Sequence, residues 1–320
     1  MTVFLGVDGG GSKTAFVLVD AGGSVLAEAV TSTTYILGDD TSGVAAVLTD
    51  GIESVCTAAG FGTDEITQAF FGLPGYGESE AGLDALAVLP RRLLGHDRYS
   101  CGNDMICGWA GSLGGADGIN VISGTGSMTY GENGGRGLRV GGWGELFSDE
   151  GSGYWIAVRG LNAFTRMSDG RLPRTALYDI LKSQLGVDHD LFALDVVLTL
   201  WGGRRDAIAA LSRVIAEAAQ AGDPVAAVIL RDAALELVTL VEATRSGLGF
   251  ADDEDVPVSY SGGVFAAPDV LSAFTAALAS TERRYDLRMP LMSPALGAAI
   301  YAARTSGAPL DAAAIARLVG

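Results

Sequence analysis

The stretch Val121-Ile122-Ser123-Gly124-Thr125-Gly126-Ser127 joins an apolar strand pattern directly to a loop of small residues. Glycine lets the backbone adopt positive φ angles and approach a ligand closely, and the amide and hydroxyl groups of such a loop can converge on phosphate oxygens. Because the chain contains 46 glycines, an ordinary tight turn is the favoured interpretation of this stretch on its own. Its meaning therefore depends on the segments around it.

The composition of the 320 residues is that of a globular protein. Apolar residues make up 48% of the chain and charged residues 18%, and the alanine-rich segments favour helices. The formal net charge of −17 argues against binding to nucleic acids or to anionic membranes, because few cations would face their phosphates. We expect two lobes of mixed α/β structure.

The cysteines and the N-terminal residues indicate the cellular compartment of the protein. Cys56, Cys101 and Cys107 match no common zinc-binding spacing and are expected to be reduced thiols, and His96 and His189 have no partner motif. The first residues lack the basic and long apolar segments of a signal peptide, and no apolar run reaches the length of a membrane span. These features predict a cytoplasmic protein.

Residues 2–7 and 15–20 are expected to form two strands joined by the turn DGGGSKT at residues 8–14. The turn offers amide donors, hydroxyl groups and the Lys13 ammonium group, while the Asp8 carboxylate can hold Mg²⁺ through water. It is not a P-loop, because the Gly-x4-Gly-Lys spacing is absent. Both a phosphate-binding hairpin and a solvated turn fit these residues.

The segment that follows has the pattern of alternating strands and helices. Strands are expected at residues 24–30 and 66–73 and a helix at 43–59, while a helix at 81–94 should be interrupted at Pro90.

Asp104 follows a short strand at residues 99–102 and precedes a helix at 105–113. An aspartate in this position is a favoured helix cap. The same carboxylate can instead act as a general base that deprotonates a hydroxyl group for attack on a γ-phosphate.

Residues 128–140 are expected to form a β-hairpin, after which the run GWGELFSDEGS at residues 142–152 leads into a helix at 154–164. Asp149 and Glu150 can accept hydrogen bonds from vicinal sugar hydroxyl groups, although an acidic turn that caps the helix is the alternative. Ser152 or one of its neighbours is the expected cap.

The second half of the chain is expected to be mostly helical from residue 174 to 251. A short strand at 256–260 then ends in the turn SGGV at 261–264, which either approaches a ligand or simply opens the helix at 268–278. The last strand is expected at 288–291, followed by helices at 295–304 and 310–318.

Taken in order, these loops resemble those of the actin-like ATPase and sugar kinase superfamily. The turn at 8–14 resembles its first phosphate loop, SGTGS at 123–127 its second, and SGGV at 261–264 its adenosine loop. The run at 142–152, with Tyr154 and Trp155 after it, is similar to the N-acetylglucosamine kinase branch of the BadF/BadG/BcrA/BcrD ATPase group. The resemblance covers essentially the whole chain.

The resemblance implies two ribonuclease-H-like lobes with a central cleft, formed by residues 1–107 with 296–320 and by residues 108–295. It implies ATP and Mg²⁺ as cofactors, a small sugar as substrate, Asp104 as the base for the sugar 6-hydroxyl, and a homodimer. The residues expected to bind the cofactors are Asp8, Gly10, Gly11, Ser12, Lys13, Thr14, Gly124, Thr125, Gly126, Ser127, Gly262, Gly263 and Val264. The residues expected to bind the sugar are Thr34, Tyr35, Asn103, Asp104, Gly142, Trp143, Asp149 and Glu150.

Two departures from the family pattern lie on the sugar side. The family usually carries an asparagine in the loop where this chain has STTY at 32–35, and a glycine where this chain has Ser148. These departures concern the identity of the sugar and leave phosphoryl transfer unaffected. From the resemblance we expect an ATP-dependent amino-sugar kinase, with the 6-hydroxyl of N-acetylglucosamine as the best fit and glucosamine or another hexose as alternatives.

Two functions of other classes fit as well, namely an ATPase that activates a partner enzyme and a non-catalytic sugar sensor. The dehydratase activators of the same group need cysteines in the second half of the chain, where this sequence has none after Cys107. The zinc-binding cysteine cluster and helix-turn-helix segment of the repressor relatives are also missing from the sequence.

Overall fold

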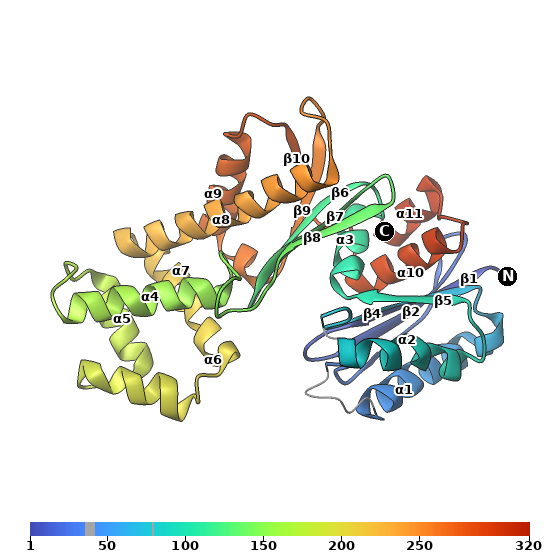
Figure 1. The fold of residues 1–320 in the computed structure, drawn as a ribbon, viewed down its shortest axis with the longest axis horizontal. Helices are drawn as coiled ribbons and strands as arrows, with labels where there is room; N and C mark the ends of the chain where they lie inside the picture. The colour runs from blue at the N-terminus through green and yellow to red at the C-terminus, as the bar shows by residue number, and fades with distance from the viewer. Residues whose placement is uncertain (36–41, 79) are drawn as a thin grey trace. The chain divides into compact units, whose positions relative to one another are not determined.

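The computed structural model describes residues 1–35, 42–78 and 80–320, which divide into two compact units (Figure 1). Unit 1 comprises Met1–Asp117 and Met289–Gly320, and unit 2 comprises Gly118–Arg288. The first boundary follows α3 (Met105–Leu113), whereas the predicted boundary between residues 107 and 108 falls inside this helix. The helix α3 belongs to unit 1 because it packs directly against α10 (Pro294–Thr305).

Unit 1 is built on a five-stranded sheet in the order β3-β2-β1-β4-β5. Its strands are β1 (Val3–Gly9), β2 (Thr14–Asp20), β3 (Val25–Thr31), β4 (Gln68–Leu73) and β5 (Tyr99–Asn103). The first three form an antiparallel meander, and β4 and β5 continue the sheet in parallel from β1.

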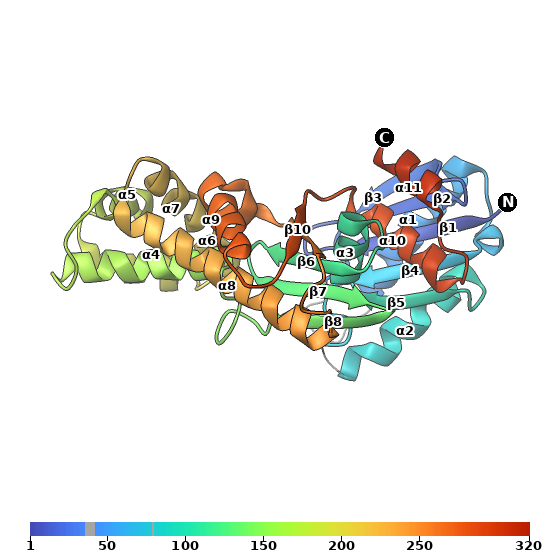
Figure 2. The same ribbon diagram turned by 90° about the horizontal axis from the view of Figure 1, so that it is seen from above.

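Helices cover both faces of this sheet (Figures 1 and 2). Because neighbouring side chains of a strand point to opposite faces, Leu5 and Val7 of β1 pack into the core with α1 (Ser42–Ala59), while Phe4 packs with α10 on the other face. At Gly6 a Cβ atom would overlap the α10 backbone, so glycine allows the close crossing of the helix. The remaining elements of unit 1 are η1 (Thr63–Glu65), α2 (Glu80–Leu94) and α11 (Ala312–Val319).

The helix α2 runs continuously through Pro90, so the predicted interruption was wrong. A proline removes the N–H that would bond to the carbonyl of Leu86, four residues earlier. Strand β5 compensates for this loss: the Cys101 Sγ donates to the Leu86 carbonyl at 3.9 Å, and the Tyr99 hydroxyl donates to the Ala87 carbonyl at 2.9 Å. Two side chains of β5 thus donate to carbonyl groups of α2 near Pro90, a contact between elements that the local sequence does not indicate.

Unit 2 has a five-stranded sheet of the same plan, in the order β10-β9-β6-β7-β8. Its strands are β6 (Gly118–Ser123), β7 (Ser127–Asn133), β8 (Arg136–Gly141), β9 (Val256–Ser261) and β10 (Tyr285–Arg288). In both units the first strand is central, two antiparallel strands lie on one side of it, and two parallel strands lie on the other. This repeated ribonuclease-H-like plan confirms the predicted α/β fold class.

The last strand lies earlier than predicted. Residues 288–291 were expected to form it, but β10 spans Tyr285–Arg288 and pairs in parallel with residues 256–259 of β9. This register packs Tyr285 and Leu287 against the core of unit 2 and leaves Pro290, which has no N–H for a ladder, outside the strand.

The helices of unit 2 form two groups, which Figure 2 shows along the sheet and beyond its end. The long helix α8 and the helix α9 pack against one face of the sheet, around Ile119 and Val121. The helices α4 to α7 and the first half of α8 form a separate apolar cluster. Their bounds are α4 (Gly153–Ser168), α5 (Ala176–Leu185), η2 (Asp190–Phe192), η3 (Asp195–Leu200), α6 (Arg205–Ala209), α7 (Leu211–Gln220), α8 (Pro224–Leu248), η4 (Gly263–Ala266) and α9 (Pro268–Ala279).

Within the described ranges, none of the helices has both the length and the apolar character that a bilayer crossing demands. The three cysteines lie in the same ranges as free thiols, and Cys56 and Cys107 are buried.

Candidate functional site

In unit 1 the turn between β1 and β2 carries the residues predicted to bind phosphate. Gly9 pairs with Thr14 at the end of the hairpin, and the Gly10 amide donates to the Lys13 carbonyl at 2.9 Å. Residues 11–13 are exposed, and the position of a Cβ atom on Gly11 is open space among the described residues. The turn therefore presents backbone amides and the Lys13 side chain to solvent.

The loop after β3 rests on this turn. The Thr33 hydroxyl donates to the Gly10 carbonyl at 2.6 Å, and the Thr14 hydroxyl donates to Thr34 Oγ1 at 3.3 Å. Thr34 is buried, whereas Tyr35 is 53% exposed. The structure thus brings both sugar-side candidates of this loop next to the glycine turn, with Tyr35 the more accessible of the two.

Asp8 in β1 and Asp104 directly after β5 come close to each other at the carboxyl ends of two parallel strands that have β4 between them. Asp8 pairs in register with Gly72 of β4, and a Cβ atom on Gly72 would lie 3.3 Å from the Asp104 Cα and would overlap Cys107 Sγ. Burial and the charge of Asp104 raise the pKa of Asp8 to about 7, although a hydrogen bond with Cys107 and the charge of Lys13 act in the opposite direction. Two carboxylates at one point suit Mg²⁺, which prefers oxygen ligands.

The helix α3 does not use the Asp104 carboxylate as its cap. Within the described residues, its first turn receives no capping hydrogen bond from the Asp104 side chain. The neighbouring Asn103 is buried and bonds locally: its Oδ1 accepts from the Met105 amide at 3.2 Å, and its Nδ2 donates to the Tyr76 carbonyl at 3.4 Å. The helix-cap explanation of Asp104 therefore loses its expected hydrogen bond.

In unit 2 the turn between β6 and β7 occupies the same place in the sheet as the glycine turn of unit 1. Ser123 pairs with Ser127, and the Gly124 amide donates to the Gly126 carbonyl at 2.9 Å. Thr125 at the tip is exposed. The two serine hydroxyls point inward: Ser123 Oγ donates to the Gly151 carbonyl at 2.9 Å, and Ser127 Oγ to the Glu150 carbonyl at 2.6 Å.

Asp149 lies directly beneath this turn. Its side chain is 2% exposed, forms an ion pair with Arg205, and accepts hydrogen bonds from the backbone amides of Ser127 and Gly144. Burial raises the pKa of Asp149 in spite of these partners. Its predicted partner on the sugar side, Glu150, is less buried and accepts from the Ser148 hydroxyl at 3.3 Å. In this arrangement the two acidic side chains have different surroundings.

The segment that carries Gly142 and Trp143 is exposed at its apolar side chains. Trp143 is 75% exposed, and Leu146 and Phe147 are also exposed. Gly142 has a φ of 72°, which favours glycine at this position. The exposed indole ring, six residues before the buried Asp149, offers a flat apolar surface to a ligand.

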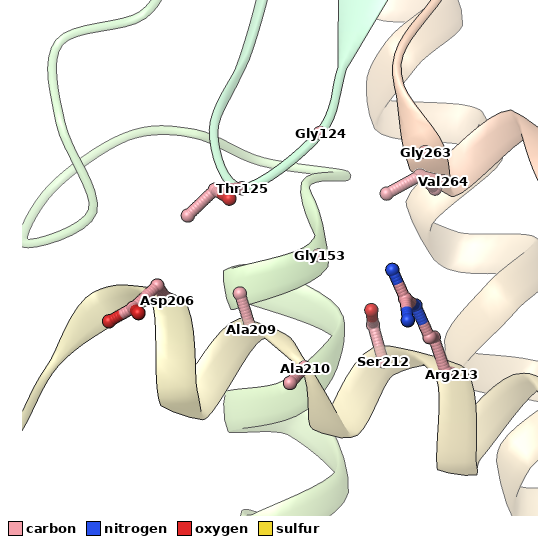
Figure 3. Close-up of a pocket in the computed structure, with 10 residues that line it drawn as sticks. All are labelled: Gly124, Thr125, Gly153, Asp206, Ala209, Ala210, Ser212, Arg213, Gly263 and Val264. Atoms are coloured by element: carbon pink, nitrogen blue, oxygen red, sulfur yellow. The ribbon is translucent and has the colours of Figure 1, made fainter. Parts of the chain in front are cut away.

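A cavity of about 310 Å³ lies in unit 2 beside the β6–β7 turn (Figure 3). Its wall joins the turn at residues 124–125, the turn at 263–264 and the helices α6 and α7. In Figure 3 the side chains of Ser212 and Arg213 extend from α7 towards Gly263 and Val264. The residues that line it are Gly124, Thr125, Gly153, Asp206, Ala209, Ala210, Ser212, Arg213, Gly263 and Val264.

Gly262 fixes the contact between the two turns of this cavity. It has a φ of 101°, and a Cβ atom there would overlap the Ser123 carbonyl. Only glycine combines this backbone conformation with such a close approach. The structure therefore brings together two of the predicted cofactor-binding segments, 124–125 and 263–264.

Three side chains at these sites were missed by the sequence analysis. Arg205 and Arg213 lie on helices whose sequence shows only an ordinary polar face, and Cys107 was expected only to be a reduced thiol. Arg205 is 56 residues from Asp149 in the chain, so no local spacing could have indicated the pair.

Comparison with known proteins identifies the family. The model of the BadF/BadG/BcrA/BcrD ATPase family matches residues 5–302. The chain belongs to this family. Membership in the BadF/BadG/BcrA/BcrD ATPase family confirms the resemblance predicted from the three glycine turns and the run at 142–152.

Two curated relatives of this BadF/BadG/BcrA/BcrD ATPase family member cover most of its length. The N-acetyl-D-glucosamine kinase of Dictyostelium discoideum is 32% identical over 319 residues, which are 94% of this chain and 97% of the relative. The N-acetylmuramic acid/N-acetylglucosamine kinase of Clostridium acetobutylicum is 32% identical over 268 residues, which are 82% of this chain and 86% of the relative.

Solved structures show the same fold. A protein of Chromobacterium violaceum, provisionally named an N-acetylglucosamine kinase, is 26% identical and has a TM-score of 0.69 over 93% of this chain and 98% of its own. A ROK family glucokinase from Streptomyces griseus, at 18% identity, has a TM-score of 0.56 over 94% of this chain and 99% of its own and shows likeness of fold alone.

Proposed function

We propose that the protein is an ATP-dependent kinase that transfers the γ-phosphate to the 6-hydroxyl of an amino sugar, with N-acetylglucosamine as the preferred substrate. The observation that carries the proposal is the approach of Asp104 to Asp8 beside the glycine turn of unit 1, because phosphoryl transfer needs a base and a metal-binding carboxylate at one point. The names of both curated relatives support N-acetylglucosamine as the acceptor.

In this proposal the nucleotide uses both glycine turns and the cavity of unit 2. The adenosine part enters the cavity beside Gly263 and Val264, whose volume of about 310 Å³ is within the range of small-molecule sites. The phosphates take the amides and hydroxyls of the two turns and the Lys13 ammonium group. The proposed phosphate-binding residues are Gly10, Gly11, Ser12, Lys13, Thr14, Gly124, Thr125, Gly126 and Ser127.

Asp8 is the proposed holder of Mg²⁺, through water. Burial and the charge of Asp104 raise the pKa of the Asp8 carboxyl group, and a cation bound beside it would favour its charged form. When bound, Mg²⁺ supplies charge neutralisation for the phosphate oxygens.

Asp104 is the proposed general base. It accepts the proton of the 6-hydroxyl as the bond from O6 to the γ-phosphorus forms and the bond to the bridging oxygen of ADP breaks. The protein forms no covalent bond to the substrates in this step, so most of the rate enhancement comes from positioning and charge neutralisation.

The proposed sugar-binding residues come from the loop at residues 34–35, from Asn103 and Asp104, and from the segment that carries Trp143 and the two acidic residues. The exposed Trp143 ring offers a face for the apolar side of a hexose, and carboxylates accept from its hydroxyls. The proposed sugar-binding residues are Thr34, Tyr35, Asn103, Asp104, Gly142, Trp143, Asp149 and Glu150. From the family resemblance alone, we also propose a cytoplasmic homodimer.

A screen of ADP release tests this proposal. The panel contains N-acetylglucosamine, glucosamine, glucose and N-acetylmuramic acid, the last because one curated relative is named for it. We expect N-acetylglucosamine to give the highest kcat/KM. ADP release that is independent of every sugar would instead indicate an ATPase, and failure to bind ATP would indicate a sugar sensor.

A further inference from the structure

Arg205 bridges two carboxylates of the segment at 142–150. It is the first residue of α6, where its Nη2 pairs with Asp149 and its Nε lies 3.3 Å from Glu145 Oε2. The same short helix lines the cavity of unit 2 through Asp206 and Ala209. The first residue of α6 therefore pairs with the acidic segment. Asp206 and Ala209 of the same helix form part of the cavity wall, as Figure 3 shows.

The Arg205–Asp149 ion pair also lies against the turn at residues 123–127, which we call the phosphate turn because of its proposed role. A Cβ atom on Gly126 would be 2.8 Å from Asp149 Oδ2 and would overlap Arg205 Nη2, so the turn has room for the pair only because residue 126 is glycine. The Ser127 amide donates to the Asp149 carboxylate, which joins the pair to the backbone of the turn.

Backbone hydrogen bonds strengthen this connection. The Gly153 amide donates to the Gly124 carbonyl at 2.7 Å, and the Tyr154 amide donates to the Thr125 carbonyl at 3.3 Å. Together with the two serine hydroxyls, these bonds tie residues 123–127 to residues 149–154 along their length. The turn and the acidic segment have little freedom to move separately.

Asp149 depends on this arrangement. Its φ of 61° lies in the left-handed region, where a side chain is strained unless its surroundings hold it. A buried carboxylate without a cationic partner is also unfavourable, and Arg205 is the ion-pair partner of Asp149. The charge and reach of Arg205 thus maintain the backbone and side-chain position of Asp149.

We propose that Arg205 is a positioning residue that couples the sugar-side segment at 142–150 to the phosphate turn at 123–127, so that nucleotide and sugar each raise the protein's affinity for the other. The inference rests on the proposed kinase function. A ligand that orders one segment orders the other through the ion pair, and the second ligand then binds to a site that is already formed. Coupling of this kind is reciprocal and amounts to about tenfold.

Titration of a non-hydrolysable ATP analogue with Mg²⁺, alone and with saturating N-acetylglucosamine, measures the coupling as a ratio of two Kd values. We expect a ratio of about ten in the unaltered protein and about three or less in Arg205→Met, in which the backbone hydrogen bonds remain, while the Kd without sugar changes less than about threefold. Arg205→Lys should keep part of the ratio because it keeps the charge. Arg231→Met, which removes an exposed arginine paired with Asp232, is the matched control and should keep all of it.

Glu145→Gln provides a second route, because it removes one of the two bridged carboxylates and leaves the buried pair intact. It should lower the ratio partially, and it decides the question if Arg205→Met does not fold. An unchanged ratio in Arg205→Met, or in Glu145→Gln when the first variant is unfolded, overturns the inference, as does a ratio of one in an unaltered protein that phosphorylates the sugar. If the unaltered protein phosphorylates no sugar of the panel, the proposed function itself fails.

Discussion

The turn between the first two strands of each sheet shows how the two units differ. In unit 1 the turn at residues 10–13 carries Lys13, is exposed, and lies at the end of a strand whose Asp8 faces Asp104. In unit 2 the turn at residues 124–126 carries no charged side chain and is tied to the segment at 149–154 by hydrogen bonds. The turns at residues 10–13 and 124–126 thus occupy equivalent positions in their sheets but have different chemical surroundings.

The repeated sheet plan thus places turns of different chemistry at equivalent positions of the two units. In unit 1 the neighbouring side chains are titratable and can serve a metal ion and a proton transfer. In unit 2 the charged residues neutralise each other as an ion pair beneath Gly126, which leaves fixed backbone donors and a rigid connection to the acidic segment. We assign chemistry to the first turn and positioning to the second.

The largest expected effect comes from Asp104→Asn. If the chemistry belongs to unit 1, kcat should fall by roughly 10²–10⁴, because the amide cannot accept the proton of the attacking hydroxyl. Nucleotide affinity should stay nearly the same. Steady-state ADP release and titration with an ATP analogue measure the two quantities, and turnover like that of the unaltered protein would remove Asp104 from the mechanism.

Gly72→Ala tests how closely the carboxylates of unit 1 are packed. Its Cβ atom would overlap Cys107 Sγ in a buried position, and overpacking of this kind costs about 1–3 kcal/mol. Urea unfolding measures the loss, with Gly11→Ala as the control, since the space at Gly11 is open among the described residues. The double variant with Cys107→Ala should recover part of the stability; equal stability of Gly72→Ala and Gly11→Ala would show that the site is looser than we describe.

Lys13→Met compared with Thr125→Ala sharpens the contrast between the two turns. Loss of a charged donor to phosphate should raise the KM for ATP about tenfold, whereas loss of a neutral hydroxyl should raise it only a few-fold. The Lys13→Met effect should also shrink as salt is added, because salt screens exposed charges. Equal effects that do not depend on salt would contradict the division of roles.

The pH dependence of stability tests the raised pKa of Asp8 in unit 1. The pKa of Asp8 is raised from 3.8 to about 7 by burial and by Asp104, so the folded state holds a proton that the unfolded state loses. This contribution is fully present below pH 3.8 and is lost as the pH rises through about 7, in the absence of Mg²⁺. Urea midpoints between pH 5 and 8 should therefore fall more steeply in the unaltered protein than in Asp8→Asn; parallel curves would contradict the raised pKa.

Much of the site near Asp8 could be predicted from the sequence. Alternating apolar residues before and after the turn at 8–14 define the hairpin, and Asp104 follows a strand that lies parallel to β1 one strand away. Carboxyl ends of parallel strands meet at one edge of a sheet, so the approach of the two carboxylates follows from topology. The family resemblance was confirmed by the family match over residues 5–302, whereas the roles of Asp8 and Asp104 stay predictions.

The remaining features depend on contacts that are distant in the chain. The helix at Pro90 continues because Cys101 supplies a donor from β5, and β10 begins at Tyr285 because its side chain packs into the core of unit 2. Arg205 meets Asp149 across 56 residues. None of these partners leaves a local pattern, so only the folded structure reveals them.

The central claim is that this chain transfers a phosphate group to the 6-hydroxyl of N-acetylglucosamine. Phosphorus–proton correlation NMR of the sugar product, after incubation with ATP and Mg²⁺, identifies the carbon that carries the phosphate. The account predicts coupling of the phosphorus to the two protons on C6 of N-acetylglucosamine. Phosphate at the anomeric oxygen, or ADP release without any phosphorylated sugar, would contradict it.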